Sequence, residues 1–345
     1  MKFERRQLAE TKGSILAHNI SDREGKRVLR KGTEIGDDEL EALKGLGREF
    51  IYVAELEQGD VSEAEAARKT AELIRGDHIR LVGAVTGRTN MLAEKPGVLR
   101  IDIDRLTALN RLPGVTLATL RDRSVVPERQ MVASIKIIPY AITAETMRAI
   151  ESIAVPGSIV SLVALQPRRV HIMFLGGAAI LDKLESDFRA ALEARIVALG
   201  SSVEGIHRVA TDMDHPESEI SSALVDLPTE EIDLLIMAGE TAVMDPRDVI
   251  PSAIKRAGGS VEITGAPVDP GNLLMIAYLD DVPVLSAPGC ARSSKENVVD
   301  WVLPSLLSGE RVEQEDITSL GHGGLLEDIK ERPFPRSAVG GNSDA

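Results

Sequence analysis

The sequence has little cysteine and few aromatic residues. Its single cysteine, Cys290, cannot form a disulfide within the chain, which is typical of proteins in a reducing compartment. Phenylalanine, tryptophan and tyrosine make up 3% of the 345 residues, so leucine, isoleucine, valine and alanine must form the core. The same scarcity disfavours an aromatic stacking surface for single-stranded nucleic acid. We therefore expect a cytoplasmic protein with an aliphatic core.

Neither excess positive charge nor a long apolar segment is present. The formal net charge of −14 argues against a nucleic-acid partner because phosphate backbones attract basic surfaces, although a local basic patch is compatible with an acidic chain. No apolar run approaches the ~20 residues that a transmembrane helix needs. Residues 1–6 lack the apolar core of a signal peptide. These absences predict a soluble protein with no membrane or nucleic-acid partner.

The length and the distribution of residue types predict two folded regions and a tail. At roughly 100–200 residues per domain, the chain has room for two or three domains. We predict a mixed α+β region over residues 1–165 and an α/β domain over residues 166–310. An extension follows over residues 311–345, and its polar, Gly-rich end is expected to be disordered after about residue 333.

Residues 1–165 combine short strands with a few helices. Ser62 and Glu65 form a capping box that predicts the start of an alanine-rich helix. The helices are expected over residues 33–46, 63–74 and 144–153. Turn residues separate strands that are expected over residues 50–54, 79–85, 98–103, 115–120 and 131–138.

Residues 166–310 alternate strands with helices. Residues 232–237 form a continuous apolar run, typical of a strand buried on both faces of a parallel sheet. Other strands are expected over residues 170–175, 203–209, 260–264, 273–277 and 283–286, and helices over residues 181–199, 215–227, 249–257 and 294–307. This alternation predicts a three-layer α/β fold with a doubly wound, mostly parallel sheet.

The first candidate binding residues follow the apolar strand directly. Gly239, Glu240 and Thr241 stand at its carboxyl end, where α/β sheets bind ligands. Glycine allows close approach to the backbone, and the threonine hydroxyl and the backbone amides suit a phosphate. A plain tight turn is the alternative interpretation of this segment.

Two carboxylates come next. Asp245 and Asp248 could hold Mg²⁺ or orient a reacting group, as catalytic and metal-binding residues at the edge of the sheet. Pro251 fits the first turn of a helix, which makes Asp248 a candidate N-cap with a purely structural role. Asp245 has no such explanation, so it is the stronger functional candidate.

Two further turns add candidate binding residues. Pro270, Gly271 and Asn272 form a turn that either presents backbone amides or simply connects two strands. The loop before the last helix combines small residues with positive charge at a helix start, which favours anions. Its candidate residues are Pro288, Gly289, Cys290, Arg292 and Ser293.

The last of these loops permits two interpretations of its cysteine. Ser293 and Glu296 form a capping box that predicts a helix from Ser294. Cys290 could have a lowered pKa beside that helix start, or it could be a small packed residue. No histidine spacing matches a zinc site, and no Walker loop or Gly-x-Ser-x-Gly motif occurs.

Taken together, these motifs resemble the molybdopterin-binding domain of molybdenum cofactor biosynthesis proteins. That family carries a Gly-Gly-Thr-type turn, an acidic loop, a Pro-Gly-Lys-Pro-type turn and a Pro-Gly-Asn-Pro-type loop that opens a helix. The corresponding elements stand in the same order here, at residues 238–242, Asp245 with Asp248, residues 269–273 and residues 288–292. Residues 136–139 and 321–326 also resemble a subgroup that is often fused to a molybdenum cofactor cytidylyltransferase-like nucleotidyltransferase.

The resemblance implies a protein that binds molybdopterin or the molybdenum cofactor, that can use Mg²⁺, and that can assist molybdenum insertion from molybdate. It also implies self-association into a homo-oligomer. The sequence departs from the family's pattern in three turns. Glu240 replaces the second glycine of the first turn, Asn272 replaces the lysine of the second turn, and Cys290-Ala291-Arg292 replaces Asn-Pro in the last loop. They favour a non-catalytic carrier that passes the cofactor to a nucleotidyltransferase or to a xanthine dehydrogenase-type enzyme. A Mg²⁺-dependent dinucleotide hydrolase is the third hypothesis.

Overall fold

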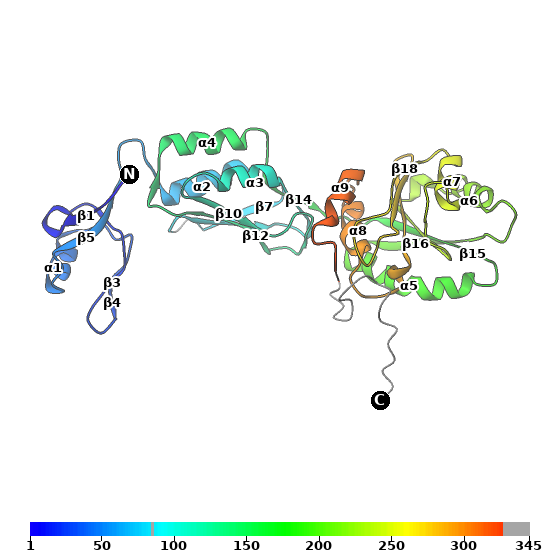
Figure 1. Cartoon of the computed structure of the whole chain (residues 1–345), viewed down its shortest axis with the longest axis horizontal. Helices are drawn as coiled ribbons and strands as arrows, with labels where there is room; N and C mark the ends of the chain where they lie inside the picture. The colour runs from blue at the N-terminus through cyan, green and yellow to red at the C-terminus, as the bar shows by residue number, and fades with distance from the viewer. Residues whose placement is uncertain (84–85, 327–345) are drawn as a thin grey trace, which may run out of the picture. The chain divides into compact units, whose positions relative to one another are not determined.

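The chain folds into two compact units, Met1–Ala164 and a second that begins at Leu165 (Figure 1). The computed structural model describes residues 1–83 and 86–326. The tail predicted to be disordered after residue 333 lies outside the described residues. Within the described part of the chain, no helix is long and apolar enough to span a membrane.

The first unit begins with a small antiparallel sheet. Its strands β1 (Lys2–Gln7), β5 (Phe50–Glu55) and β2 (Ile15–Leu16) pair in the order β1-β5-β2. Helix α1 (Asp37–Gly45) contributes the buried Leu43 to the cluster beneath this sheet. The helix begins later than predicted because the Glu39 carboxylate accepts a hydrogen bond from the Gly36 amide, which makes Gly36 the cap. A hairpin follows β2, with strands β3 (Ile20–Ser21) and β4 (Arg27–Leu29).

The remainder of the first unit contains α2 (Glu63–Ile74), α3 (Ile103–Asn110) and α4 (Ala144–Ala154). Its longer strands are β7 (Ile79–Val82), β8 (Arg88–Ala93), β9 (Gly97–Ile101), β10 (Val115–Thr119), β12 (Met131–Ile137) and β14 (Val160–Ala164). Helix α3 was not predicted. Asp102 caps it by accepting a hydrogen bond from the Arg105 amide at 2.9 Å, so the strand expected over residues 98–103 ends at Ile101.

The second unit is built on a six-stranded sheet in the order β16-β15-β17-β20-β19-β18. Strands β15 to β17 and β20 run parallel, whereas β19 is antiparallel to both of its neighbours. The strand bounds are Arg169–Gly176 for β15, Ser202–Ala210 for β16, Leu234–Gly239 for β17, Ser260–Thr264 for β18, Met275–Leu279 for β19 and Val282–Ser286 for β20. This order confirms the predicted doubly wound, mostly parallel sheet.

Helices cover both faces of this sheet. Helices α5 (Leu181–Ala198) and α8 (Val298–Ser308) pack on one face, and α6 (Pro216–Val225) and α7 (Val249–Arg256) pack on the other. Figure 1 shows α5 on the opposite side of the sheet from α6 and α7. A short helix, α9 (Gln314–Thr318), follows α8. The predicted three layers are therefore present, with β17 buried between them.

The start of α8 differs from the prediction. Residues Gly289–Arg292 form a 3-10 turn, and the α-helix begins only at Val298. Asn297 is the cap, because its side chain accepts a hydrogen bond from the Val299 amide at 3.0 Å and its own amide donates to Asp300 at 2.9 Å. The expected capping box of Ser293 and Glu296 does not form, since the Glu296 carboxylate accepts a hydrogen bond from the Trp301 indole.

Candidate functional site

The candidate site lies where the parallel strands of the second unit end. The register places Leu175 of β15 beside Gly239 of β17, and Gly176 beside Ala210 of β16. Met237 of β17 pairs with Ser286 of β20. The loops after these four strands therefore meet at one edge of the sheet, as the sequence predicts for a ligand site.

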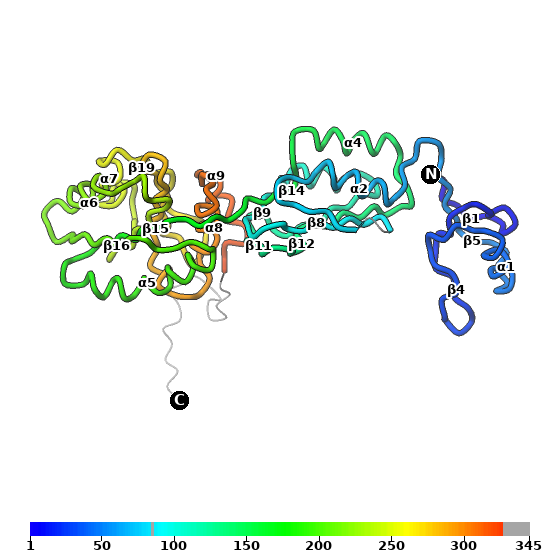
Figure 2. The backbone as a smooth tube through the Cα atoms, turned by 180° about the vertical axis from the view of Figure 1, so that it is seen from behind, coloured from blue at the N-terminus to red at the C-terminus, as the bar shows by residue number. Residues whose placement is uncertain are grey.

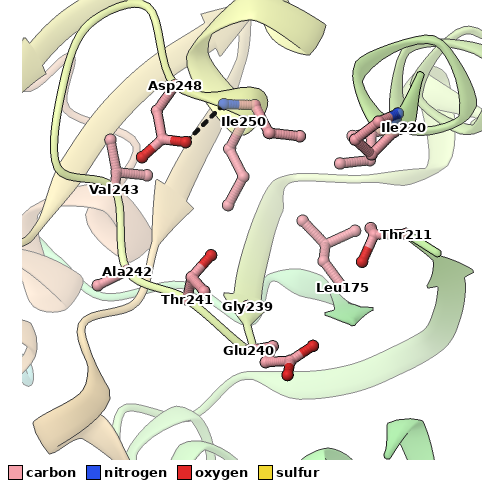
Figure 3. A pocket seen from close by; sticks show the side chains of 12 residues that line it. Leu175, Thr211, Ile220, Gly239, Glu240, Thr241, Ala242, Val243, Asp248 and Ile250 are labelled. Carbon is pink, nitrogen blue, oxygen red and sulfur yellow. Dashed lines mark hydrogen bonds between the residues drawn. The ribbon is translucent and has the colours of Figure 1, made fainter. Parts of the chain in front are cut away.

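A cavity of about 150 Å³ opens at this edge (Figure 3). Its walls are mostly aliphatic and its rim carries hydroxyl and carboxylate groups. The lining residues are Leu175, Thr211, Pro216, Ile220, Gly239, Glu240, Thr241, Ala242, Val243, Asp248, Val249 and Ile250. Four predicted site residues, Gly239, Glu240, Thr241 and Asp248, thus line a single cavity.

Gly239 is required by the tightness of the turn after β17. A Cβ at this position would lie 2.7 Å from the Thr241 carbonyl oxygen, closer than van der Waals contact allows. The glycine therefore permits the backbone to fold back on itself, so that residues 240–242 border the cavity.

Glu240 turns towards the end of β15. Its Oε2 accepts a hydrogen bond from the Gly177 amide at 3.2 Å, and Asp212 Oδ2 accepts one from the Ala178 amide at 2.5 Å. The protein's own carboxylates thus occupy two backbone amides that would suit an anion. Asp212 was not identified from the sequence. The only signal was the Gly176-Gly177 pair after a strand, and nothing in the sequence pointed to the acidic partner.

Asp248 is held between a loop and a helix. Its Oδ1 accepts a hydrogen bond from the Val249 amide at 2.8 Å, and its Oδ2 accepts one from the Met244 amide at 3.1 Å. Pro251 lies in the first turn of α7, as the sequence predicts. Asp248 is therefore an N-cap that also borders the cavity.

Asp245 lies in a different environment. Its carboxylate accepts hydrogen bonds from the Arg247 backbone amide at 2.8 Å and from the Arg247 guanidinium at 2.9 and 3.1 Å. This hydrogen bonding holds the pKa of the Asp245 carboxyl below its ordinary value. Among the described residues that line the cavity, Asp248 is present and Asp245 is not.

The other predicted binding residues gather at the start of α8. The Val298 amide donates to the Pro270 carbonyl at 3.2 Å, and Gly271 packs so closely on Val298 that a Cβ at residue 271 would overlap its side chain. The second predicted turn therefore supports the helix start. Its close packing accounts for the glycine without any ligand.

The loop over residues 288–295 is anchored by Arg195 of α5. The Arg195 guanidinium donates to the carbonyl oxygens of Ala291, Ser293 and Lys295 at 3.2, 2.8 and 2.9 Å. It also pairs with Asp300 at 2.8 Å. In the sequence Arg195 is one more polar position on a helix, so its role in the loop was not predicted.

Two side chains of this loop differ from expectation. The Arg292 guanidinium stacks over the Phe188 ring, 4.7 Å from its centroid, so one face of this charged group packs against the protein. Burial raises the pKa of the Cys290 thiol, which contradicts the lowered pKa considered from the sequence. The alternative interpretation, a partly buried small residue, agrees with the structure.

The described residues do not provide a ready-made metal centre. Nowhere in residues 1–83 and 86–326 do three or more His, Cys, Asp or Glu side chains gather around a point that could hold a metal ion. Asp245 and Asp248 as Mg²⁺ ligands stay a prediction, and a bound ion there would need oxygen atoms from its substrate. His171 and His207 form a pair at 2.9 Å, and burial lowers the pKa of both rings.

The two roles of Asp248 can be separated by substitution. We expect Asp248→Ala to lower the free energy of unfolding by about 1–2 kcal/mol, because α7 loses its cap, whereas Asp248→Asn retains most of that stability. Urea unfolding of both variants measures the difference. If Asp248→Asn is as destabilised as Asp248→Ala, the charge matters more to α7 than the cap geometry does.

Comparisons with known proteins match parts of the chain. A family model described as Domain of unknown function (DUF8806) matches residues 6–55. None of the curated proteins matches the chain.

Three of the solved structures that match the chain come from proteins of molybdenum cofactor biosynthesis. A molybdenum cofactor biosynthesis protein from Pyrococcus furiosus is 14% identical, with 92% of this chain and 65% of that chain covered and a TM-score of 0.24. Molybdenum cofactor biosynthesis protein B is 16% identical, with 42% and 96% covered and a TM-score of 0.29. The molybdopterin biosynthesis protein MoeA from Pyrococcus horikoshii is 13% identical, with 89% and 75% covered and a TM-score of 0.29. At these scores the similarities support no conclusion about activity.

Proposed function

We propose that the chain binds molybdopterin or the molybdenum cofactor during cofactor maturation. The observation that supports this most is the cavity beyond β17, because four residues predicted from the family's turn and acidic loop line it together. A cavity of about 150 Å³ holds a group the size of one aromatic ring. A larger ligand would therefore insert one ring and extend along the sheet edge.

The lining fits a flat, polar-edged ring. Leu175, Ile220 and Ile250 supply apolar surface for its faces, and the hydroxyls of Thr211 and Thr241 can bond to polar atoms at its rim. A phosphate on the same ligand would meet the backbone amides of residues 241–242 or the loop over residues 288–293. Equilibrium titration with molybdopterin, followed by fluorescence, tests this mode of binding, and Gly239→Val is expected to abolish it.

The carrier role is favoured over catalysis. The carboxylates of Glu240, Asp245 and Asp248 all accept hydrogen bonds from donors of the protein itself. A general base or metal ligand would have to exchange these partners during each turnover. In this proposal the chain receives the cofactor and passes it to a nucleotidyltransferase or to a xanthine dehydrogenase-type enzyme, and self-association is an added expectation.

Asp245 distinguishes the carrier from an enzyme. For a carrier, we expect Asp245→Ala to bind molybdopterin within about twofold of the unmodified chain, since exposed ion pairs contribute little. An enzyme that inserts molybdenum would instead lose turnover while keeping its affinity. Molybdate-dependent turnover, measured beside affinity, decides between the two. Hydrolysis of an ADP-ribose-like dinucleotide in Mg²⁺ would favour the hydrolase hypothesis.

Glu240 is expected to limit affinity for anionic ligands. Two like charges about 4 Å apart repel each other by roughly 1–4 kcal/mol, depending on whether the effective dielectric constant is that of water or of a protein surface. We therefore expect Glu240→Gln to bind a phosphate-bearing pterin about tenfold more tightly. Glu230→Gln is the matched control, because this exposed residue precedes the opposite end of β17. Unchanged affinity in Glu240→Gln would show that the phosphate lies elsewhere.

A further inference from the structure

The exposed aromatic side chains of the described chain gather on one small sheet. Phe3, Phe50 and Tyr52 are 49, 45 and 46% exposed, and they belong to strands β1 and β5. The other described aromatic residues are buried or half-buried. In a chain with 3% aromatic residues, this concentration on one solvent-facing surface is a feature that core packing does not explain.

The strand register places these rings on a common face. Tyr52 lies opposite Arg5 and Phe50 lies opposite Gln7, and residues directly opposite each other share a face. The rings of Phe3 and Tyr52 are 6.0 Å apart with planes only 25° from parallel, and His18 contacts both. The other face carries Ile51 and Val53, which are buried with Leu43 of α1, so the aromatic face is the uncovered one.

Positive charge lies on this face at Arg5 and on the hairpin next to it. The Arg5 guanidinium lies 4.7 Å from the Phe50 ring centroid, and within the described residues it has no carboxylate partner. The hairpin that follows His18 projects from the sheet (Figure 2) and adds five exposed cations. They are Arg23, Lys26, Arg27, Arg30 and Lys31, and no carboxylate of the described chain pairs with them. The Lys31 amide donates to Asn19 at 2.9 Å, which fixes the base of the hairpin beside His18.

We propose that this face and its hairpin bind single-stranded nucleic acid. Phenylalanine, tyrosine, histidine and the arginine plane are the side chains on which unpaired bases stack, and all four are exposed here. Arg23, Lys26, Arg27, Arg30 and Lys31 would neutralise the phosphates along the strand. The net charge of −14 led us to expect no nucleic-acid partner, but that total conceals a hairpin in which five cations accompany two acids, Asp22 and Glu24.

An acidic protein is the other occupant that such a surface could accept. Single-stranded nucleic acid is favoured because the uncovered face of the sheet offers aromatic rings and a cation. The aliphatic side chains of Ile51 and Val53 lie on the opposite face, in the core. Bases and phosphates match both kinds of group at once. A peptide of acidic residues would match only the cations.

The test is fluorescence anisotropy of a labelled 12-nucleotide oligo(U) with the full chain at 50 and 200 mM salt. Binding should weaken with salt, as phosphate contacts require. Each stacked base contributes about tenfold in affinity, so the Phe3→Ala/Tyr52→Ala double variant should lose about a hundredfold. Tyr52→Phe keeps the ring and should bind as the unmodified chain does.

Charge variants keep the test independent of the fold of the sheet. Arg27→Glu/Arg30→Glu changes only exposed hairpin residues and should reduce both the affinity and its salt dependence. Arg111→Glu/Arg148→Glu, at two exposed positions outside the small sheet and its hairpin, is the matched control and should change little. Absence of binding at 50 mM salt would overturn the proposal. Equal affinity for a polyglutamate peptide would also overturn it in favour of an acidic protein. Equal affinity for duplex RNA would overturn it as well, because binding would then depend on charge alone and not on unpaired bases.

Discussion

Replacement of Arg195 by leucine is expected to lower the free energy of unfolding by about 3 kcal/mol, because removing one partner of a largely buried ion pair leaves the other uncompensated. The side chain of Arg195 is 9% exposed, and its guanidinium bonds to Asp300 and to three loop carbonyls. Asp300 and the Lys295 carbonyl keep a hydrogen bond from Asn297, but all four groups lose the Arg195 donor together. Urea unfolding, with the change in midpoint at constant slope, measures the effect.

Two further variants make the Arg195 result specific. Arg189→Leu removes an arginine from the same helix whose own side chain is 46% exposed. Its partners are Glu193 and Glu185, and Glu185 keeps its ion pair with Arg208, so the substitution should cost less than about 1 kcal/mol. Arg195→Lys should recover only part of the loss, because one ammonium group cannot reproduce the planar set of donors. If Arg195→Leu proves no more destabilising than Arg189→Leu, Arg195 does not anchor the loop.

Substitution of Gly271 by alanine is the second change with a large expected effect. The φ angle of Gly271 is +137°, which side chains rarely adopt, and a Cβ would overlap Val298 at the start of α8. Backbone strain and overpacking each cost about 1–3 kcal/mol, so we expect a loss of about 3 kcal/mol. Thermal or urea unfolding measures it.

Gly258 supplies the matched control for Gly271. Its φ angle is +89° and no atom lies within 4 Å of the position that a Cβ would take, so Gly258→Ala experiences backbone strain without overlap. We expect it to lose about 1 kcal/mol. A second variant, Gly271→Ala with Val298→Ala, should regain part of the lost stability. Equal losses in Gly271→Ala and Gly258→Ala would show that contact with Val298 contributes nothing.

Local signals in the sequence predicted elements of both units. The apolar run at residues 232–237 marked β17, and Pro251 placed Asp248 at the start of α7. Ser62 and Glu65 likewise marked the start of α2, where the Glu65 amide donates to the Ser62 hydroxyl. These features depend on residues within a few positions of one another, so a single sequence contains them.

Features that depend on distant residues were missed. Arg195 binds a loop about 100 positions away, and the Ala178 amide bonds to Asp212 across a helix and a strand. The start of α8 was misplaced because Asn297 and Asp300 form a better cap than the expected Ser293 and Glu296. Cys290 was considered for a lowered pKa from its neighbours in sequence, whereas its burial depends on how the loop packs. Tertiary contact decided each of these cases.

The most direct test of the proposed function is the pterin content of the purified protein. The chain would be produced together with an active cofactor pathway, and bound pterin would be oxidised to its fluorescent derivative while molybdenum is measured by elemental analysis. We predict stoichiometric pterin in the unmodified chain and none in Gly239→Val, whose side chain would collide with the Thr241 carbonyl beside the cavity. The molybdenum content would then tell whether the precursor or the finished cofactor is bound. A chain that carries no pterin while the pathway is active would contradict the proposal.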